Sequence, residues 1–516
     1  MNKTPAHLTT AGLIICGLSH AMAGEPPHIN SPILGTIQQT TLTIPGTAFG
    51  MPGPDSSLVV AGGDTSFVIP SSAPIISSWT DTEIVVTIDD RARSGNVRIR
   101  TVDGTSNAAR VEVYAYDWFD IPPTYGTNAS PLSIATGADG QVWVNQEFHL
   151  EFQHLDPAAG IVEGLAIPKP PDPGPFATTL FSDRRTQMST LGEDIIVDPQ
   201  GRVWFTQGGG YLYGGVNPNH SRIVCYDPNN AEYRVYNMPG DWNEIIGIAW
   251  DETRERMWVA QGGLEKGPKL ASFDPEAIPW DNHFDFSQSL DYQVCDFGEP
   301  WEDCYQVYDL PETSFQPAHL LVDHRGLIWY TAYWGNAIGV LHPETGRVIE
   351  YPLPEPIGQG DPVWIVGSGP WQIVRAPNNG DIVFCEFFDS TIGRFNIART
   401  LDPDCRTLIN NDTENPCIDE WVIPDVDLKN ETVHSIAFDP DGRLWYTIHT
   451  VKGFAGDASL GFITPDWKHI VRLPPMKDFP ANADASGAGV AVDPTTGDVY
   501  FCEFWRHRIG RLQRVE

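Results

Sequence analysis

The chain has 516 residues, 19% of them charged, and its 67 acidic residues outnumber its 32 lysines and arginines. The formal net charge of −35 excludes nucleic acids and anionic membrane surfaces as expected partners, because like charges repel one another. Colloidal solubility accounts for such a charge, and recruitment of a cationic ligand is the alternative interpretation.

The first 23 residues are typical of a secretory signal peptide. Lys3 precedes an apolar stretch from Ala11 to Leu18, and Ala21-Met22-Ala23 supplies small residues for cleavage before Gly24. The stretch is shorter than the ~18 residues of a membrane span, and no later apolar run approaches that length. We therefore expect a cleaved signal peptide and a secreted or periplasmic protein without a membrane partner.

Residues 28–116 are predicted to form a small immunoglobulin-like β-sandwich. Segments such as 94–114 alternate apolar and polar residues and are separated by Gly, Ser and Asp turns. The Phe49-Gly50 turn and the segment Trp79-Thr80-Asp81-Thr82 resemble motifs of IPT/TIG domains. That resemblance implies a spacer or a surface for contact with another protein.

A tryptophan-marked segment recurs seven times from residue 137 to the C-terminus. Copies such as DPQGRVWFTQ (198–207), DHRGLIWYTA (323–332) and DPDGRLWYTI (439–448) are followed in most repeats by an apolar strand and then by a strand ending in proline. Repeats of roughly 40–50 residues with four short strands each are typical of propeller blades. We therefore predict an all-β fold, with a seven-bladed β-propeller over 117–516 behind the immunoglobulin-like β-sandwich.

The seventh repeat lacks its last strand. It ends at Ile509-Gly510-Arg511-Leu512, whereas a matching proline-ended strand, Phe119-Asp120-Ile121-Pro122, precedes the first repeat. We predict that this upstream strand pairs with residues 508–514 as the outermost strand of the last blade. Such pairing closes the ring and leaves only short sheet edges.

Two pairs of cysteines lie close together in polar insertions between blade strands. In an oxidising compartment they predict the disulfides Cys295–Cys304 and Cys405–Cys417, since their spacings do not suit a zinc ribbon. Cys385 and Cys502 occupy the same repeat position in blades 5 and 7 and are expected to be buried apolar side chains. Cys225 is left over and is expected to be a free thiol.

Polar side chains follow the marker tryptophan by three residues in five of the seven blades. A ring of amides and carboxylates converging on the propeller axis would suit a ligand or a metal ion. The alternative is a set of buried polar groups that bind ordered water. The residues at this second candidate position are Gln146, Gln207, Gln261, Glu386 and Glu503.

The first candidate position precedes the first apolar strand of each blade. Glu193, Trp371 and His434 occupy it in blades 2, 5 and 6, while His319 and His449 lie nearby in blades 4 and 6. An imidazole together with carboxylates of neighbouring blades can bind a hard divalent cation or act as a general acid/base pair. A purely structural role is the alternative for each single histidine.

The segment GLIWYTAYWGNAIGVLHPETGRVIEYPLP (326–354) resembles the repeats of streptogramin B (virginiamycin B) lyases, which are seven-bladed propellers. The resemblance extends over residues 117–512. It implies a magnesium ion bound by histidine and glutamate of the last two blades, and a further histidine that opens a cyclic depsipeptide by elimination. By position it assigns the metal to His434 and, with an offset of one residue, to Glu503.

The catalytic base of that family has no counterpart at the matching position. Ala488 stands there, the companion glutamate falls on Ser486, and an aromatic hydroxyl of blade 1 falls on Leu132. The sequence therefore predicts either a lyase with a relocated base, His319 or His449, or a propeller without enzymatic activity.

The leading hypothesis is a metal-assisted lyase that abstracts a proton next to a carbonyl group, with Mg²⁺ or Ca²⁺ bound by His434, Glu503 and Glu386. One alternative is a non-enzymatic propeller that binds a small molecule, a carbohydrate or a protein, and another is a polysaccharide lyase. If His319, His434 and His449 lie within hydrogen-bond or ligand distance of one another, an enzyme is favoured. If they are dispersed over the outer faces of the propeller, a non-enzymatic binding protein is favoured. The predicted substrate-binding residues are Glu193, Gln146, Gln207, Gln261, Tyr333 and Trp371.

Overall fold

The computed structural model describes most of the chain outside its longer loops. The described residues are 25–62, 65–122, 130–146, 151–167, 190–191, 194–209, 222–237, 245–262, 267–277, 305–354, 368–410, 414–424, 426, 431–450, 460–474 and 487–516. The predicted signal peptide, Glu193, Ser486 and the pair Cys295/Cys304 lie outside them. Within the described part of the chain, no helix has the length and apolar character that crossing a membrane would require.

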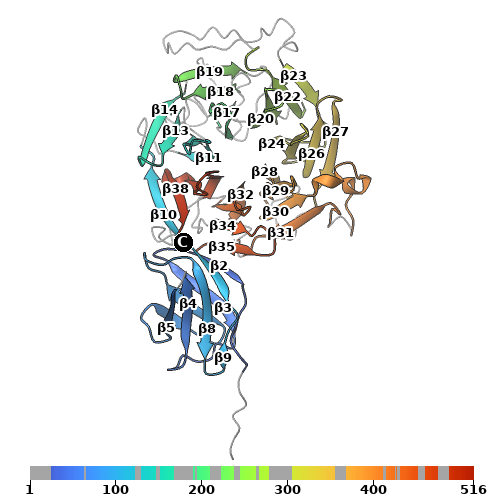
Figure 1. Cartoon of the computed structure of the whole chain (residues 1–516). Helices are drawn as coiled ribbons and strands as arrows, with labels where there is room; N and C mark the ends of the chain where they lie inside the picture. Colours follow the sequence, from blue (N-terminus) through green and yellow to red (C-terminus); the bar gives the residue numbers. More distant parts are fainter. Residues whose placement is uncertain are drawn as a thin grey trace, which may run out of the picture. The chain divides into compact units, whose positions relative to one another are not determined.

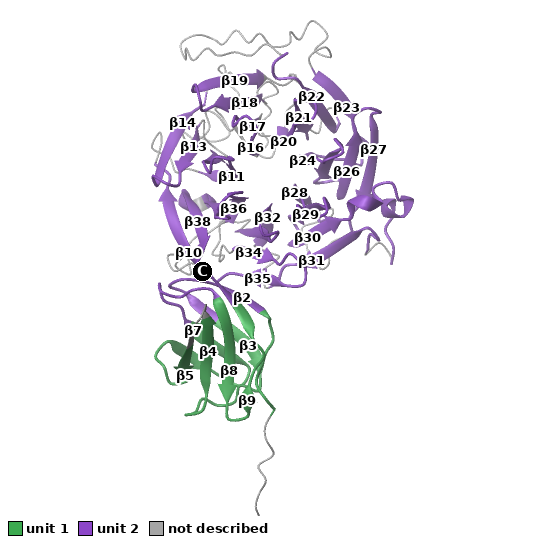
Figure 2. Cartoon of the chain, in the orientation of Figure 1, with its two compact units in different colours: residues 1–32, 43–86, 95–110 green, residues 33–42, 87–94, 111–516 purple. Residues whose placement is uncertain are grey.

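Two compact units make up the chain (Figure 2). The first contains residues 1–32, 43–86 and 95–110, and the second contains 33–42, 87–94 and 111–516. The second unit thus includes three segments of the predicted 28–116 sandwich. Ile37 and Tyr114 account for part of this grouping, because they pack in one apolar cluster with Trp445 and Phe462 of the propeller.

The first unit is built from short antiparallel strands. One sheet has the order β1-β3-β7-β6, and in the other β5, β4 and β8 pair in that order, with β9 on β8. The indole of Trp79 donates to the carbonyl of Phe49 at 3.3 Å, so the two segments that carry the IPT/TIG resemblance meet. The resemblance itself stays a prediction. The strands are β1 (His28–Ile29), β3 (Thr41–Thr47), β4 (Ser57–Gly62), β5 (Thr65–Pro70), β6 (Ile76–Trp79), β7 (Glu83–Thr87), β8 (Gly95–Thr101) and β9 (Gly104–Thr105).

The second unit is a ring of seven antiparallel sheets (Figure 1), which confirms the predicted seven-bladed β-propeller. In the first six blades the strands run in chain order from the centre outward. Blades 1 to 3 are β11 (Pro131–Thr136), β12 (Val142–Gln146), β13 (Glu151–Asp156), β14 (Ile161–Ala166); β16 (Ile195–Val197), β17 (Val203–Gly209), β18 (Arg222–Asp227), β19 (Glu232–Asn237), with β15 (Thr190–Leu191) also on β17; and β20 (Ile245–Asp251), β21 (Arg256–Gln261), β22 (Lys269–Phe273), β23 (Tyr305–Asp309).

The next three blades follow the same order. Blades 4 to 6 are β24 (Pro317–Val322), β25 (Ile328–Ala332), β26 (Ala337–His342), β27 (Arg347–Pro352); β28 (Pro370–Arg375), β29 (Ile382–Glu386), β30 (Thr391–Phe395), β31 (Ile418–Val422); and β32 (Glu431–Phe438), β33 (Leu444–Thr450), β34 (Leu460–Ile463), β35 (Ile470–Arg472). Short 3-10 helices also occur: η3 (Ile397–Arg399), η4 (Pro403–Arg406) and η5 (Phe504–Arg506).

The seventh blade is completed by a strand from upstream of the first repeat. Its own strands are β36 (Gly487–Val492), β37 (Val499–Glu503) and β38 (Arg508–Arg514), and β10 (Ala109–Asp120) adds the outermost position. Phe119 pairs with Ile509 and Asp120 with Arg508, as the missing strand predicts. The strand is longer than expected toward its N-terminus, and β2 (Ile33–Ile37) pairs with it as well.

The marker tryptophan is anchored by an aspartate that begins the same repeat. In blade 4, Oδ2 of Asp323 accepts the indole N–H of Trp329 at 3.0 Å, while Oδ1 accepts the backbone N–H of Leu327 at 3.0 Å. The indole is fully buried, so the aspartate satisfies a donor that would otherwise be stranded in the core. The same pair recurs as Asp198–Trp204, Asp251–Trp258 and Asp439–Trp445.

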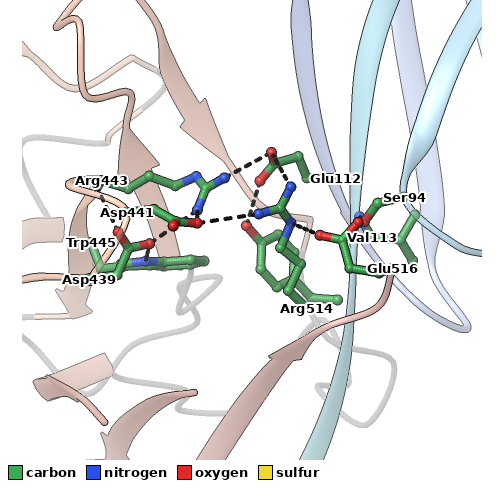
Figure 3. A network of polar contacts seen from close by, with 10 residues as sticks. Ser94, Glu112, Val113, Asp439, Asp441, Arg443, Trp445, Arg514 and Glu516 are labelled. Atoms are coloured by element: carbon green, nitrogen blue, oxygen red, sulfur yellow. Dashed lines mark hydrogen bonds and ion pairs between the residues drawn. The ribbon is translucent and has the colours of Figure 1, made fainter. Parts of the chain in front are cut away.

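Charged side chains link the closing strand to blade 6 and to the C-terminal strand (Figure 3). Glu112 of β10 is almost completely buried, and its carboxylate lies 3.1 Å from the guanidinium of Arg443 and 3.3 Å from that of Arg514. Both guanidinium groups also contact Asp441. The ring is thus closed by an ionic network as well as by strand pairing.

The cysteines of blade 5 form the predicted disulfide. Cys405 and Cys417 are bonded across twelve residues of sequence, in the insertion between β30 and β31. The other described cysteines are free and buried, as expected: Cys225, Cys385 and Cys502.

Candidate functional site

The first candidate position of the blades lies at a β-bulge in the innermost strand. The pairing of β32 with β33 shifts between Val433 and Ser435, so His434 is the extra residue. In β24 the shift between Pro317 and Leu320 includes His319, and that in β28 includes Trp371. Bulges redirect side chains, and the innermost strands of adjacent blades pack against one another around the centre in Figure 1. Side chains from different blades therefore meet here.

The three histidines singled out from the sequence gather with aromatic rings at these bulges. The ring centroids of His434 and His449 are 5.1 Å apart, and Trp371 lies 5.0 Å from His319 and 6.1 Å from His434. Further rings surround them, with Tyr333 on Trp371, Phe387 on His434 and Phe504 on His449. We call these seven residues the axial cluster. They come from blades 4 to 7.

Two imidazoles of the axial cluster, those of His434 and His449, are uncharged at neutral pH. Burial, with a smaller contribution from His449 and His319, lowers the pKa of His434 well below its usual range. Burial also lowers the pKa of His449 to about 4. A neutral imidazole presents one N–H donor and one acceptor nitrogen.

Two imidazole nitrogens of the axial cluster are buried without a hydrogen bond. They are Nδ1 of His434 and Nε2 of His319, neither of which has a partner among the described residues. Because buried polar atoms in folded proteins almost always have a partner, these two atoms mark places where a ligand would form hydrogen bonds.

The backbone of each bulge is fixed from the preceding blade. The hydroxyl of Thr331 donates to the carbonyl of Trp371 at 2.7 Å, and that of Thr447 donates to the carbonyl of Ala488 at 2.5 Å. The thiol of Cys385 occupies the same place and contacts the carbonyl of His434 at 3.5 Å. These contacts hold the axial cluster rigidly, which gives the buried Cys385 a structural role.

The polar residues at the second candidate position bond within their own blades. Oε1 of Gln146 accepts the backbone N–H of Ser130 at 3.0 Å, and Oε1 of Gln207 accepts a hydrogen bond from Arg222 at 2.5 Å. Gln261 is completely buried. These side chains lie at the end of the second strand of each blade, one layer out from the centre, and the partners of Gln146 and Gln207 belong to the preceding loop and to the third strand.

The two carboxylates predicted to bind a metal ion also have partners in their own blades. Glu503 is fully buried, pairs in register with Arg508, and contacts its guanidinium at 3.1 Å. Glu386 shares a hydrogen bond with Glu420 of β31. Burial, and then repulsion by the carboxylate of Glu420, raises the pKa of Glu386 well above its usual range. This shift favours the protonated form of Glu386, the form less suited to binding a cation.

The predicted metal ligands come from three neighbouring blades, Glu386 from blade 5, His434 from blade 6 and Glu503 from blade 7. Among the described residues, one group of three histidine, cysteine or acidic side chains has all its ligand atoms within 4.8 Å of one another, namely Asp402, Cys405 and Cys417. The two cysteines of that group form a disulfide, so it offers no thiolate. His434, Glu386 and Glu503 are not among such groups, and a shared cation site for them stays a prediction.

Sequence reasoning missed the residue directly after the first candidate position in blades 2, 5 and 6. Its side chain bonds to the next blade: Oδ2 of Asp194 accepts the N–H of Ile248 at 3.0 Å, and Oε1 of Gln372 accepts that of Ile436 at 2.6 Å. Ser435 similarly accepts the N–H of Val490 at 2.9 Å. The available signal was a polar residue directly after the first candidate position in several repeats. A pattern of alternating strand residues does not reveal a β-bulge, so it could not show that this side chain points to the next blade.

Comparison with protein-family models and with curated proteins gave no match. Among solved structures, the chain is similar to a streptogramin B lyase, at 19% identity and a TM-score of 0.51, over 78% of this chain and 98% of that one. It is also similar to a virginiamycin B lyase from Staphylococcus aureus, at 17% identity and a TM-score of 0.51, over 78% and 99% of the two chains. Likeness at these identities establishes the β-propeller fold alone.

Proposed function

We propose that the protein binds a small, uncharged, ring-bearing molecule at the axial cluster. The observation that carries this proposal is the pair of buried imidazole nitrogens, on His434 and His319, that have no partner among the described residues and flank the indole of Trp371. Ligand sites typically combine apolar and aromatic walls with a few polar groups that fix orientation. Stacked or edge-on contact with Trp371 and Tyr333 would supply the apolar part of the binding energy.

The charges near the axial cluster favour an uncharged ligand. His434 and His449 are neutral at pH 7 because burial depresses their pKa values. Arg506 and Arg508 lie in the same blade as Phe504, but both face the buried carboxylate of Glu503. With a net charge of −35, the chain repels polyanions, which argues against an acidic polysaccharide as the substrate.

The metal-assisted lyase hypothesis receives less support. The matching position for the base is Ala488, and the two predicted carboxylate ligands are engaged by Arg508 and by Glu420. We therefore derive no chemical step through a cation.

A cation titration tests the predicted metal set directly. We expect Mg²⁺ and Ca²⁺ to change the melting temperature of the wild type and of His434→Ala by the same amount, because the ligand atoms of His434, Glu386 and Glu503 do not all lie within 4.8 Å of one another. Differential scanning calorimetry at pH 7.5, over 0–10 mM chloride salt, measures this. A stabilisation present in the wild type and absent from His434→Ala would restore the metal-assisted hypothesis.

Ligand binding is tested with 5-nitroindole, an uncharged bicyclic probe. We expect one-to-one binding to the full chain, and a loss of about tenfold in affinity, or roughly 1.4 kcal/mol, in Trp371→Leu. Trp421→Leu on the outer strand β31 is the matched control, since its indole packs on Trp467 and lies outside the axial cluster. Isothermal titration calorimetry gives both affinities. Equal affinities in the two variants, or no binding, would overturn the proposed site.

A further inference from the structure

His319 departs from the bonding pattern of its repeat position. In blades 2, 5 and 6 the residue after the first candidate position accepts a backbone N–H from the next blade, as Asp194, Gln372 and Ser435 do. His319 occupies that position in blade 4, and no such bond from its ring to the N–H of Ile373 occurs among the described contacts. Its imidazole is therefore not needed to join blades 4 and 5. That frees it for another role.

The carboxylate of Asp194 faces the imidazole of His319. Oδ2 of Asp194 lies 3.5 Å from Nδ1 of His319, and both side chains are largely buried. The carboxylate is fixed, since its Oδ1 accepts the N–H of Ile195 at 2.9 Å and its Oδ2 accepts that of Ile248 at 3.0 Å. The other ring nitrogen, Nε2, is buried and has no partner in the described structure. One ring nitrogen of His319 thus faces a carboxylate, while the other has no protein partner in the described structure and could accept a proton. A histidine that acts as a general base beside an orienting carboxylate has this arrangement.

Gly247 of blade 3 allows this approach between blades 2 and 4. A Cβ atom at residue 247 would lie 2.2 Å from the carbonyl oxygen of Ala318 and 2.7 Å from Cα of His319. Both contacts are with backbone, which cannot rotate away. Any side chain there would push blade 4 outward and separate His319 from the carboxylate that Ile248 holds in place.

We propose that Asp194 and His319 form a proton-accepting pair that acts on the molecule bound at the axial cluster. The inference rests on the proposed function for the presence of that molecule. Nε2 of His319 takes a proton from an acidic C–H, N–H or O–H group of the ligand, the bonding electron pair stays on the ligand, and Asp194 stabilises the imidazolium that forms. The ligand is thus an uncharged ring-bearing compound with one acidic proton. His319 is the catalytic residue and Asp194 the positioning residue.

The experiment uses 5-nitrobenzisoxazole, a neutral bicyclic compound whose ring C–H proton is removed by a base. The C–H electron pair becomes part of a nitrile, the N–O bond breaks, and the oxygen leaves as a coloured phenolate. We expect the full chain to exceed free imidazole at equal concentration by about 10²-fold or more. His319→Gln should reduce the rate to that of solution. Asp194→Asn should lower kcat and alter its pH profile while KM stays the same, as expected for an orienting group.

Exposed His342 at the end of β26 provides the control, because His342→Gln should retain the wild-type rate. A rate that survives His319→Gln, or a wild-type chain that binds 5-nitroindole but shows no rate above imidazole, would overturn the pair. If the wild-type chain does not bind 5-nitroindole, the proposed binding function is refuted instead. In that case, modification by diethyl pyrocarbonate decides between outcomes. The reagent transfers an ethoxycarbonyl group to Nε2 of His319 and releases ethyl carbonate. Because Asp194 orients the ring, this reaction should be several-fold faster in the wild type than in Asp194→Asn. Equal rates would refute the pair.

Discussion

Replacing Arg443 by methionine should lower the free energy of unfolding by about 3 kcal/mol, because it removes one of two cations that face the buried carboxylate of Glu112. Breaking a buried ion pair from one side leaves a charge that neither water nor a counter-ion stabilises fully. Arg514 remains 3.3 Å from Glu112, so the loss should not reach the cost of a fully unpaired charge. Urea denaturation monitored by tryptophan fluorescence measures the change.

Arg202→Met is the matched control for this variant. Arg202 has the same repeat position in blade 2 and contacts its own aspartate, Asp198, but its other partner is the exposed Glu276 rather than a buried carboxylate. Arg202→Met should cost less than Arg443→Met, because both variants lose the contact with the buried aspartate of their own repeat but only Arg443→Met also takes a cation away from Glu112. The double variant Arg443→Met/Glu112→Gln should recover part of the loss. Equal losses in Arg443→Met and Arg202→Met would contradict a role for Glu112 in closing the ring.

Acidification should destabilise the protein through the buried histidines before most carboxylates titrate. His449 has a pKa of about 4 in the folded chain, whereas an unfolded histidine titrates near 6.5. Between these values the unfolded state binds more protons, so the free energy of unfolding falls as the pH falls. For His449 alone the loss between pH 7.5 and pH 5 is about 2 kcal/mol. His434 acts in the same direction, because its pKa is lowered too.

The measurement compares urea midpoints at pH 7.5 and pH 5 for the wild type, His449→Gln and His342→Gln. His449→Gln should lose less stability on acidification than the wild type, while the exposed His342 should leave the pH dependence unchanged. If His449→Gln and the wild type show the same dependence on pH, the imidazole is not buried in its neutral form.

The fold was predictable because its signals are local in the sequence. The two residues of each Asp–Trp pair, such as Asp323 and Trp329, are at most seven residues apart in the sequence. The short motif that forms the turn and buries the indole can therefore be recognised in each repeat that contains it. The closing strand could be found because one blade lacked a strand that six others have. Its extension back to Ala109 was not predictable, since residues 109–116 alternate like any sandwich strand.

The site was only partly predictable because side-chain direction at strand ends depends on partners distant in the repeat. His319, His434 and His449 do lie together with Trp371 and Tyr333. Glu503, however, bonds to Arg508, since the two residues face each other across β37 and β38. Polar residues that follow apolar strands show that the end of the strand carries polar side chains. They do not show whether those side chains point to the propeller axis or to the outer strands of the same blade.

Asp194 illustrates the other omission. Its partner His319 is two blades away, and the contact exists because a bulge in β24 turns the side chain of His319 and because Gly247 lets blades 3 and 4 approach closely. None of these conditions is encoded within one repeat. Glu193, the neighbouring residue chosen from the sequence, lies outside the described residues.

A crystal structure of the full chain with 5-nitroindole tests the central claim most directly. We expect the ligand in van der Waals contact with Trp371, with a polar atom within hydrogen-bond distance of Nε2 of His319 or Nδ1 of His434. Asp194 should still face the opposite nitrogen of His319. A probe bound elsewhere, with both imidazole nitrogens bonded to protein groups, would contradict it.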